Sequence, residues 1–263
     1  MSFTLDKIFT TATYKPNLTG YTEIEPCAEL KPYIRCFWEY RGGSRSLVIP
    51  DLCADVMFDC GDFGLNSSFV GVSNKRFHSQ GDTPCFFAIR FYAWSAVLFS
   101  DVDMRASLNT FIDAREYFAD IKLYLEPKLL SAKNMYERKH RTEKYLINRL
   151  DLSRENSDLM NSLYCIIQSC GRASVGDLAD YCSVSKRTLE RRFLENTALT
   201  PKEMLSLVRY QLLWQELLAS RLCIQDCVEK FGFYDQPHLL REFKKFHGMT
   251  PSRAVELAFD PKL

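Results

Sequence analysis

The chain has 263 residues, of which 46% are hydrophobic and 13% aromatic, and its formal net charge is +1. This composition supports packed cores and excludes bulk disorder, and the length predicts two domains rather than one. No apolar run reaches the roughly 18 residues of a membrane helix, and the N-terminal sequence MSFTLDKIFT lacks the basic and apolar parts of a signal peptide. We therefore expect a cytoplasmic protein that makes no membrane contact.

Residues 1–106 are predicted to form a small β-barrel or cupin-like domain that senses an effector. Between Tyr21 and Phe99, short apolar runs alternate with polar turns, and the clearest runs are Leu47–Ile49, Ala54–Phe58, Phe69–Val72 and Cys85–Phe91. Many short strands with frequent turns are typical of small barrels and sandwiches. Such a fold can hold a small-molecule effector, although no residue identifies which one.

The same region lacks the motifs of the common catalytic and metal sites. His78 is its only histidine, so a two-histidine metal site is not expected. The chain has no Walker loop, no G-x-S-x-G elbow and no H-E-x-x-H. None of the ten cysteines forms a Cys-x-x-Cys pair. We expect no catalytic residue, no metal and no cofactor.

Residues 107–160 are predicted to be a helical connector and a candidate dimerisation segment. The spacing of three and four that is typical of an amphipathic helix recurs there, at Leu108, Phe111, Ile112, Arg115 and Phe118. The stretch 131–152 is dense in Lys and Arg with apolar residues interspersed. A solvated helix face is a better interpretation of this basic run than contact with DNA phosphates.

The C-terminal region, residues 161–263, contains one internal repeat. Val175–Pro201 and Ile224–Pro251 align with one extra residue in the second copy, and both end in Thr-Pro. Each copy is a short helix, a tight turn and a second helix rich in Arg and Lys, which is the layout of a helix-turn-helix. A longer apolar-patterned helix, beginning at Thr200-Pro201, joins the copies. If rigid, it would hold the two second helices roughly 34 Å apart, one turn of DNA.

The two second helices carry the candidate DNA contacts, because their basic clusters fall at the same place in both copies. In the first copy Ser185 is the expected cap, and the base-facing set is Arg187, Glu190 and Arg191. In the second copy, Asp235 is the expected cap, and the base-facing set is Gln236, Pro237, Leu240 and Arg241. Arg can form hydrogen bonds with guanine and Gln with adenine, and Glu can accept a hydrogen bond from the cytosine amino group. Leu can make an apolar contact with a thymine methyl group. The expected contacts to the DNA backbone are Lys186, Arg192, Lys244 and Lys245.

These residues resemble the AraC/XylS family of bacterial transcription regulators. The resemblance covers about Asn161–Leu257 and rests on GFYDQPHLLREFKKFHGMTPS, on SVSKRTLERRF and on Arg209. It implies a seven-helix domain with the same two base-facing sets. The sequence departs from the family pattern at Ser183, where Gly is usual, at Val228, where Ala is usual, and at Cys223, where a hydroxyl cap is usual.

The N-terminal region is similar, more loosely, to an uncharacterised sensor-like domain found ahead of such DNA-binding modules. This similarity rests on Phe37-Trp38, Ile49-Pro50-Asp51 and Ile89-Arg90-Phe91. It implies a barrel-like fold that binds an effector or a partner, without naming the ligand.

The leading hypothesis is a sequence-specific regulator of transcription that binds double-stranded DNA and is controlled by a small molecule or partner. RNA polymerase and a second copy of the chain are further candidate partners. The alternative is a DNA-directed repair or modification enzyme with a reactive cysteine in residues 1–100, where the cysteines are evenly scattered: Cys27, Cys36, Cys53, Cys60 and Cys85. A redox-responsive regulator is a third hypothesis.

Overall fold

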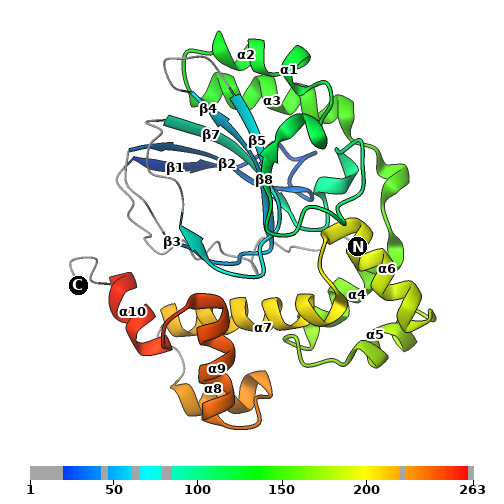
Figure 1. Ribbon diagram of the computed structural model, residues 1–263, viewed down its shortest axis with the longest axis vertical. Helices are drawn as coiled ribbons and strands as arrows, with labels where there is room; N and C mark the ends of the chain where they lie inside the picture. Colours follow the sequence, from blue (N-terminus) through cyan, green and yellow to red (C-terminus); the bar gives the residue numbers. More distant parts are fainter. Residues whose placement is uncertain (1–19, 43–46, 61–65, 79–84, 220–222, 260–263) are drawn as a thin grey trace.

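A sheet domain followed by a helical region makes up the chain, and the predicted α+β class is confirmed (Figure 1). The computed structural model describes residues 20–42, 47–60, 66–78, 85–219 and 223–259. Within these ranges, no helix combines the length and the apolar character needed to cross a bilayer.

The sheet has six antiparallel strands in the order β1-β2-β7-β4-β5-β8, and a separate two-stranded sheet pairs β3 with β6. The bounds of the large sheet are β1 Tyr21–Ile24, β2 Ile34–Arg41, β7 Cys85–Tyr92, β4 Cys53–Asp59, β5 Asn66–Val70 and β8 Phe111–Asp113. The small sheet consists of β3 Leu47–Val48 and β6 Phe77–His78. Among the described residues, β1 and β8 are the two edges of the large sheet. The sheet is therefore open, because a closed barrel requires its edge strands to pair.

Strand β8 corrects the expectation of a helix from residue 107. Phe69 pairs with Ile112 and Val70 with Phe111 across the β5–β8 ladder. Ile112 and Phe111 are β-branched and aromatic residues that suit a strand, and the ladder with β5 outweighs a helical spacing that is only local. After β8, a single 3-10 turn, Ala114–Glu116, leads into the helices.

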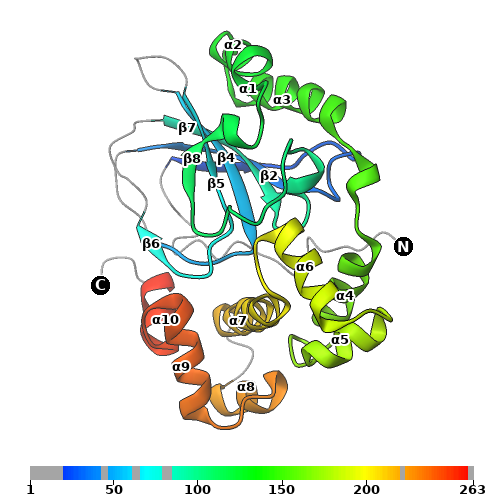
Figure 2. The same cartoon turned by 45° about the vertical axis from the view of Figure 1, so that its right-hand side comes forward.

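Three helices cover one side of the sheet, and α7 lies on the other side (Figures 1 and 2). Their bounds are α1 Ile121–Tyr124, α2 Glu126–Leu130 and α3 Met135–Arg149. Helix α3 confirms the helical prediction for the charged stretch 131–152. It begins where the Asn134 side chain accepts a hydrogen bond from the Glu137 N–H, and it buries Tyr145 and Leu146.

Seven helices follow among the described residues of 157–219 and 223–259, as the family resemblance implies. They are α4 Ser157–Gln168, α5 Val175–Tyr181, α6 Lys186–Thr197, α7 Pro201–Leu218, α8 Ile224–Phe231, α9 Gln236–His247 and α10 Pro251–Phe259. Figure 2 views α7 nearly end-on, with α4–α6 on one side of it and α8–α10 on the other. Helix α7 therefore lies between the two repeats and connects them.

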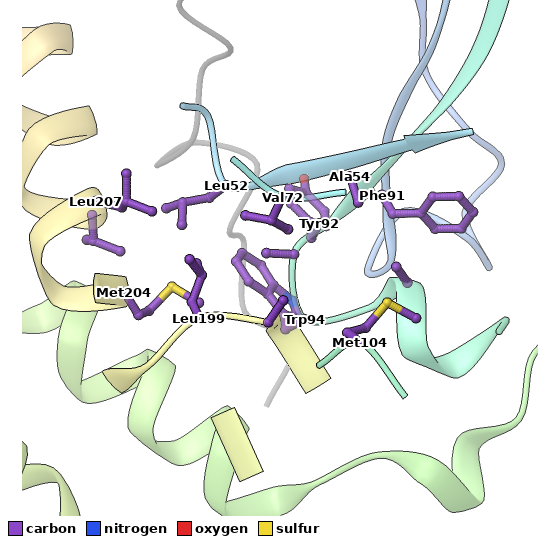
Figure 3. Packing of buried hydrophobic residues seen from close by; sticks show 14 of the residues in the cluster. Leu52, Ala54, Val72, Phe91, Tyr92, Trp94, Met104, Leu199, Met204 and Leu207 are labelled. Carbon is purple, nitrogen blue, oxygen red and sulfur yellow. The ribbon is translucent and has the colours of Figure 1, made fainter. Parts of the chain in front are cut away.

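The sheet domain packs directly on α7, and one hydrophobic cluster runs through both. Figure 3 shows Leu52 and Val72 facing Leu199, Met204 and Leu207 across this contact. Three hydrogen bonds accompany the apolar contact. The buried Gln211 donates from Nε2 to the Pro50 carbonyl. Asn74 Nδ2 donates to Glu203 Oε1 at 2.9 Å, and the Met104 N–H donates to the Glu195 carbonyl at 2.8 Å. The two regions form one continuous structure.

Candidate DNA-binding surface

The first repeat begins with a capping box, as its sequence predicts. The Ser174 Oγ accepts from the Asp177 N–H at 3.1 Å, and the Asp177 carboxylate accepts from the Ser174 N–H at 2.8 Å. These hydrogen bonds lower the pKa of Asp177 because they favour its charged form. They satisfy two backbone donors that would otherwise be unpaired at the start of α5.

A tight turn at Ser183 and Val184 connects α5 to α6. Ser183 has φ +54°, the left-handed conformation that favours glycine, so the departure from the family pattern at this position carries backbone strain. The Val184 N–H closes the turn on the Ala179 carbonyl at 3.0 Å. The Ser185 hydroxyl accepts from the Thr188 N–H at 3.1 Å and caps α6. The predicted cap is therefore present.

Helix α6 buries one face and exposes the other. Leu189 and Phe193 are fully buried, and the exposed side carries the predicted base-facing set, Arg187, Glu190 and Arg191. Lys186 is also exposed, at the first position of the helix, next to the cap. All four lie in the first half of α6, which is the half that contacts base edges in a helix-turn-helix.

Arg192 differs from the other predicted contacts. Its guanidinium is paired with the carboxylate of Asp158, in the first turn of α4, and only 26% of its side chain is exposed. The ion pair directs Arg192 toward α4, away from the exposed face. The sequence could not indicate this pairing, because the two residues lie 34 positions apart.

The second repeat reaches the same geometry with different residues. Gly232 ends α8 with φ +65°, where a Cβ would meet Arg172 Cδ at 2.8 Å. The Phe233 N–H donates to the Val228 carbonyl at 3.0 Å. The Asp235 carboxylate then caps α9 by accepting from the His238 N–H at 2.7 Å. Gly232 and Ser183 thus occupy equivalent left-handed positions in the two turns.

On α9, five of the predicted contacts are exposed: Gln236, Pro237, Arg241, Lys244 and Lys245. Leu240 is half-buried and packs against the hydrophobic core. Two exposed tyrosines lie beside the turns of the two repeats and were not among the predicted residues. Tyr234, beside the cap of α9, is 91% exposed, and Tyr181, at the end of α5, is 57% exposed. Their nearness to the turn in each repeat is the signal that could have found them.

Arg209 joins the two repeats across α7. It donates from Nε and Nη2 to the Gly171 carbonyl at 3.2 and 2.5 Å, which ties α7 to the loop before the first repeat. Its guanidinium also lies 5.5 Å from the centre of the Phe233 ring, in the turn of the second repeat. Burial lowers the pKa of Arg209. One side chain therefore contacts both units and fixes their relative position.

The far end of α9 is anchored by a buried histidine. His247 Nδ1 lies 2.9 Å from the Tyr210 hydroxyl, and its ring stacks on Phe243 with centroids 4.8 Å apart. Burial is the largest cause that lowers the pKa of His247, to about 4, and the charge of Arg76 adds to it. The ring is neutral at pH 7 and fills the contact between α7 and α9.

Comparison with protein families agrees with this geometry. A family model described as a helix-turn-helix domain matches residues 178–256, from α5 to α10. Residues 178–256 are therefore a helix-turn-helix domain, and the chain is a DNA-binding transcription regulator. A second model, described as a domain of unknown function (DUF6597), matches residues 22–113, from β1 to β8. The regulator binds DNA, and its C-terminal domain is the part that does so.

No curated protein matches the regulator. Among solved structures, it is similar to ToxT from Vibrio cholerae, at 11% identity over 92% of this chain and 100% of that one, with a TM-score of 0.46. The C-terminal domain of AraT, a response regulator from Geobacillus stearothermophilus, is 21% identical over 39% of this chain and 87% of its own, with a TM-score of 0.37. A DNA-binding transcriptional dual regulator from Escherichia coli K-12 is 16% identical over 40% and 96%, with a TM-score of 0.36.

Proposed function

We propose that α6 and α9 enter two successive major-groove segments on one face of the DNA. The observation that carries this proposal is the exposure of polar side chains in the first half of both helices, while their opposite faces are buried. Helix α7 lies between the two units and is 18 residues long, which corresponds to about 27 Å. This length is comparable with the roughly 34 Å repeat of the groove.

The two helices contact different bases. Arg187 and Arg191 suit guanine because their planar forks match the O6 and N7 acceptors, and Glu190 accepts from a cytosine amino group. In the second unit, Gln236 pairs with adenine and Arg241 with guanine, while Pro237 and the exposed part of Leu240 provide apolar contact. The first segment is therefore recognised through more charged groups than the second.

Lys186, Lys244 and Lys245 contact phosphates, since a flexible ammonium group is a point charge that does not discriminate between bases. Arg192 contributes to the phosphate surface only together with Asp158, whose charge offsets its own. Exchanging Lys244 for Ala should weaken binding to all sequences equally and reduce its salt dependence, whereas exchanging Arg187 should change the base preference.

The sheet domain receives the regulatory signal, and the sheet face that carries Trp38 is a candidate effector site. Trp38 lies there in a second hydrophobic cluster with Tyr40, Met57 and Phe86. Arg90 lies under the Trp38 ring and bonds to the Asp55 carboxylate through Nε and Nη2, at 2.9 and 3.0 Å. Aromatic side chains beside a fixed polar pair are typical of small-molecule sites.

The route from this sheet to the DNA is the contact between Pro50 and Gln211, because β4 begins three residues after Pro50, at Cys53. Effector candidates can be screened by the shift they cause in thermal unfolding and in DNA affinity. A Trp38→Leu variant should lose the response to a ligand that binds this face. The comparison is a Trp94→Leu variant, because Trp94 is buried in the main hydrophobic cluster, where the sheet domain packs on α7 (Figure 3). An equal response from the Trp38 variant and the wild type would place the effector elsewhere.

The regulator performs no chemistry on DNA in this proposal. Strand β4 begins just after Leu52, which faces α7 in Figure 3, and its seven residues span about 23 Å before Cys60. Cys60 and its neighbour Cys85 thus lie at the end of the sheet remote from α6 and α9. An assay for covalent change in bound DNA should be negative with the wild type and with a Cys85→Ser variant alike.

We also propose that a second copy of the chain docks on α1–α3, and that RNA polymerase contacts the DNA-bound form. Large apolar side chains are exposed along these helices, namely Leu123, Tyr124, Leu130, Tyr136 and Ile147. Exposed apolar patches of this kind commonly mark interfaces. In sedimentation experiments, Tyr136→Glu should shift a dimer to monomer, whereas the exposed Lys144→Glu should not. A wild type that sediments as a monomer would contradict the dimer.

A further inference from the structure

Folding brings together two cysteines that are 25 positions apart in the sequence. Cys60 directly follows β4, and Cys85 is the first residue of β7. The β4–β7 register pairs Asp59 with Phe86, so that Cys60 lies opposite Cys85, and the Cys60 N–H donates to the Cys85 carbonyl at 2.9 Å. Opposed residues of an antiparallel pair have Cα atoms about 4.5–5.5 Å apart. This separation falls within the range that a disulfide requires.

The pair has an environment that distinguishes it from the other cysteines. Both side chains are half-buried, and the Cys60 thiol lies next to the Cys85 thiol and 3.6 Å from the Phe58 carbonyl oxygen. Two cations lie near them: Arg41, which is the β2 partner of Cys85, and Arg138 from α3. The Glu39 carboxylate forms ion pairs with both cations, at 2.7 Å from Arg41 Nε and 2.6 Å from Arg138 Nη1. The sulfur atoms are thus accessible, adjacent and close to positive charge.

These contacts separate the acidities of the two thiols. The hydrogen bond from Cys60 is the largest cause that lowers the pKa of Cys85, to about 7, and the same bond raises the pKa of Cys60. Elsewhere burial raises the thiol pKa, at Cys27, Cys36, Cys53, Cys165 and Cys227. Cys85 is therefore the attacking group and Cys60 the resolving group.

We propose that Cys60 and Cys85 form a reversible dithiol–disulfide site that is oxidised by hydroperoxides. The Cys85 thiolate attacks one oxygen of hydrogen peroxide, the O–O bond breaks, hydroxide leaves and Cys85 becomes a sulfenic acid. The Cys60 sulfur then attacks the Cys85 sulfur and displaces the hydroxyl group, which leaves as water with the Cys60 proton. One peroxide is reduced as two thiols are oxidised. A dithiol reductant reduces the Cys60–Cys85 disulfide to two thiols and is itself oxidised to a disulfide.

The bond would join the residue directly after β4 to the first residue of β7, at the end of these two central strands that is remote from α7. It requires no rearrangement of the ladder, because the two residues already face each other. The inference concerns this site alone and does not depend on which bases α6 and α9 contact.

The test is peptide mapping of the full-length protein after treatment with equimolar hydrogen peroxide at pH 7, followed by alkylation of the remaining thiols. We expect one cross-linked pair of peptides that contains Cys60 and Cys85. Its mass should be two hydrogen atoms below that of the two reduced peptides together, and dithiothreitol should restore the free thiols. In Cys60→Ser, a 1,3-diketone probe should label Cys85 as sulfenic acid. In Cys85→Ser, the rate of peroxide consumption should fall at least tenfold, whereas the control Cys165→Ser should react like the wild type.

Alkylation rates supply a second readout that needs no variant. The rate at Cys85 should reach half its maximum near pH 7, and that at Cys165 should still rise above pH 8. The proposal is overturned if a different cysteine pair cross-links first, if Cys60 and Cys85 remain reduced while other thiols oxidise, or if Cys85 alkylates no faster than Cys165. These readouts on the wild type remain decisive even if a serine variant does not fold.

Discussion

Replacing Arg209 by Ala should uncouple the two helix-turn-helix units without destroying either of them. The substitution removes the two hydrogen bonds to the Gly171 carbonyl and the contact with the Phe233 ring. A hydrogen bond to a charged group contributes about 1.5–3 kcal/mol, and a partly exposed cation–π contact about 0.5–1 kcal/mol. Because Arg209 is only half-buried, a combined loss of about 2 kcal/mol is the better expectation.

That loss should appear in DNA binding as well as in stability. If the complex must restore the relative position of the units, 2 kcal/mol corresponds to an affinity about 30-fold weaker for a site with both segments. Affinity for a duplex with one segment should change little, because each recognition helix keeps its own cap and core. Fluorescence anisotropy with three duplexes, one carrying both segments and two carrying either segment alone, measures these affinities, and urea unfolding measures the stability.

Two variants complete this experiment. Arg209→Lys keeps the charge but loses the fork, so its affinity should lie between those of the wild type and Arg209→Ala. Lys202→Ala changes an exposed residue of the same helix and should match the wild type. The reasoning is refuted if Arg209→Ala binds the two-segment site as tightly as the wild type, or if it loses one-segment binding to the same extent.

Two further predictions concern the turns and a buried ring. Ser183→Gly should stabilise the protein by about 0.5–1 kcal/mol, because the relief of left-handed strain exceeds the added entropy of the unfolded chain. Gly232→Ala should destabilise it by about 1–2 kcal/mol. If urea unfolding showed that both variants change the free energy of unfolding in the same direction, this prediction would be wrong. The pKa of His247 is lowered to about 4, so the unfolded state binds the proton more tightly, and on the order of 3 kcal/mol of stability should be lost as the pH falls from 6.5 to 4. His247→Phe should flatten this dependence, and an unchanged slope would show that other groups cause it.

The DNA-binding domain could be predicted from sequence because its signals are local. Caps such as Ser185 and Asp235, the glycine at position 232 and the spacing of Leu189 and Phe193 act within one or two helical turns. Each of them agrees with the final structure, and the repeat supplies every signal twice. The positions of α5 to α9 and their caps therefore follow from short stretches of sequence.

Long-range contacts could not be predicted in this way. Strand β8 exists because it pairs with β5, although its own spacing favours a helix. Cys60 meets Cys85 only through the register of β4 and β7, so that cysteines which are scattered in the sequence become neighbours in the sheet. Gln211 bonds to Pro50 across 161 positions and joins the sheet to α7. No local pattern contains such pairings, because they arise from packing between elements.

The central claim is that α6 and α9 recognise different DNA segments, and selection of bound duplexes from a random pool tests it most directly. The wild type should yield two conserved segments whose centres are about one helical turn apart. Arg187→Ala should lose base preference in one segment only, and Arg241→Ala in the other only, each at a cost of about 1–3 kcal/mol. Loss of preference in the same segment by both variants, or in neither, would contradict the account.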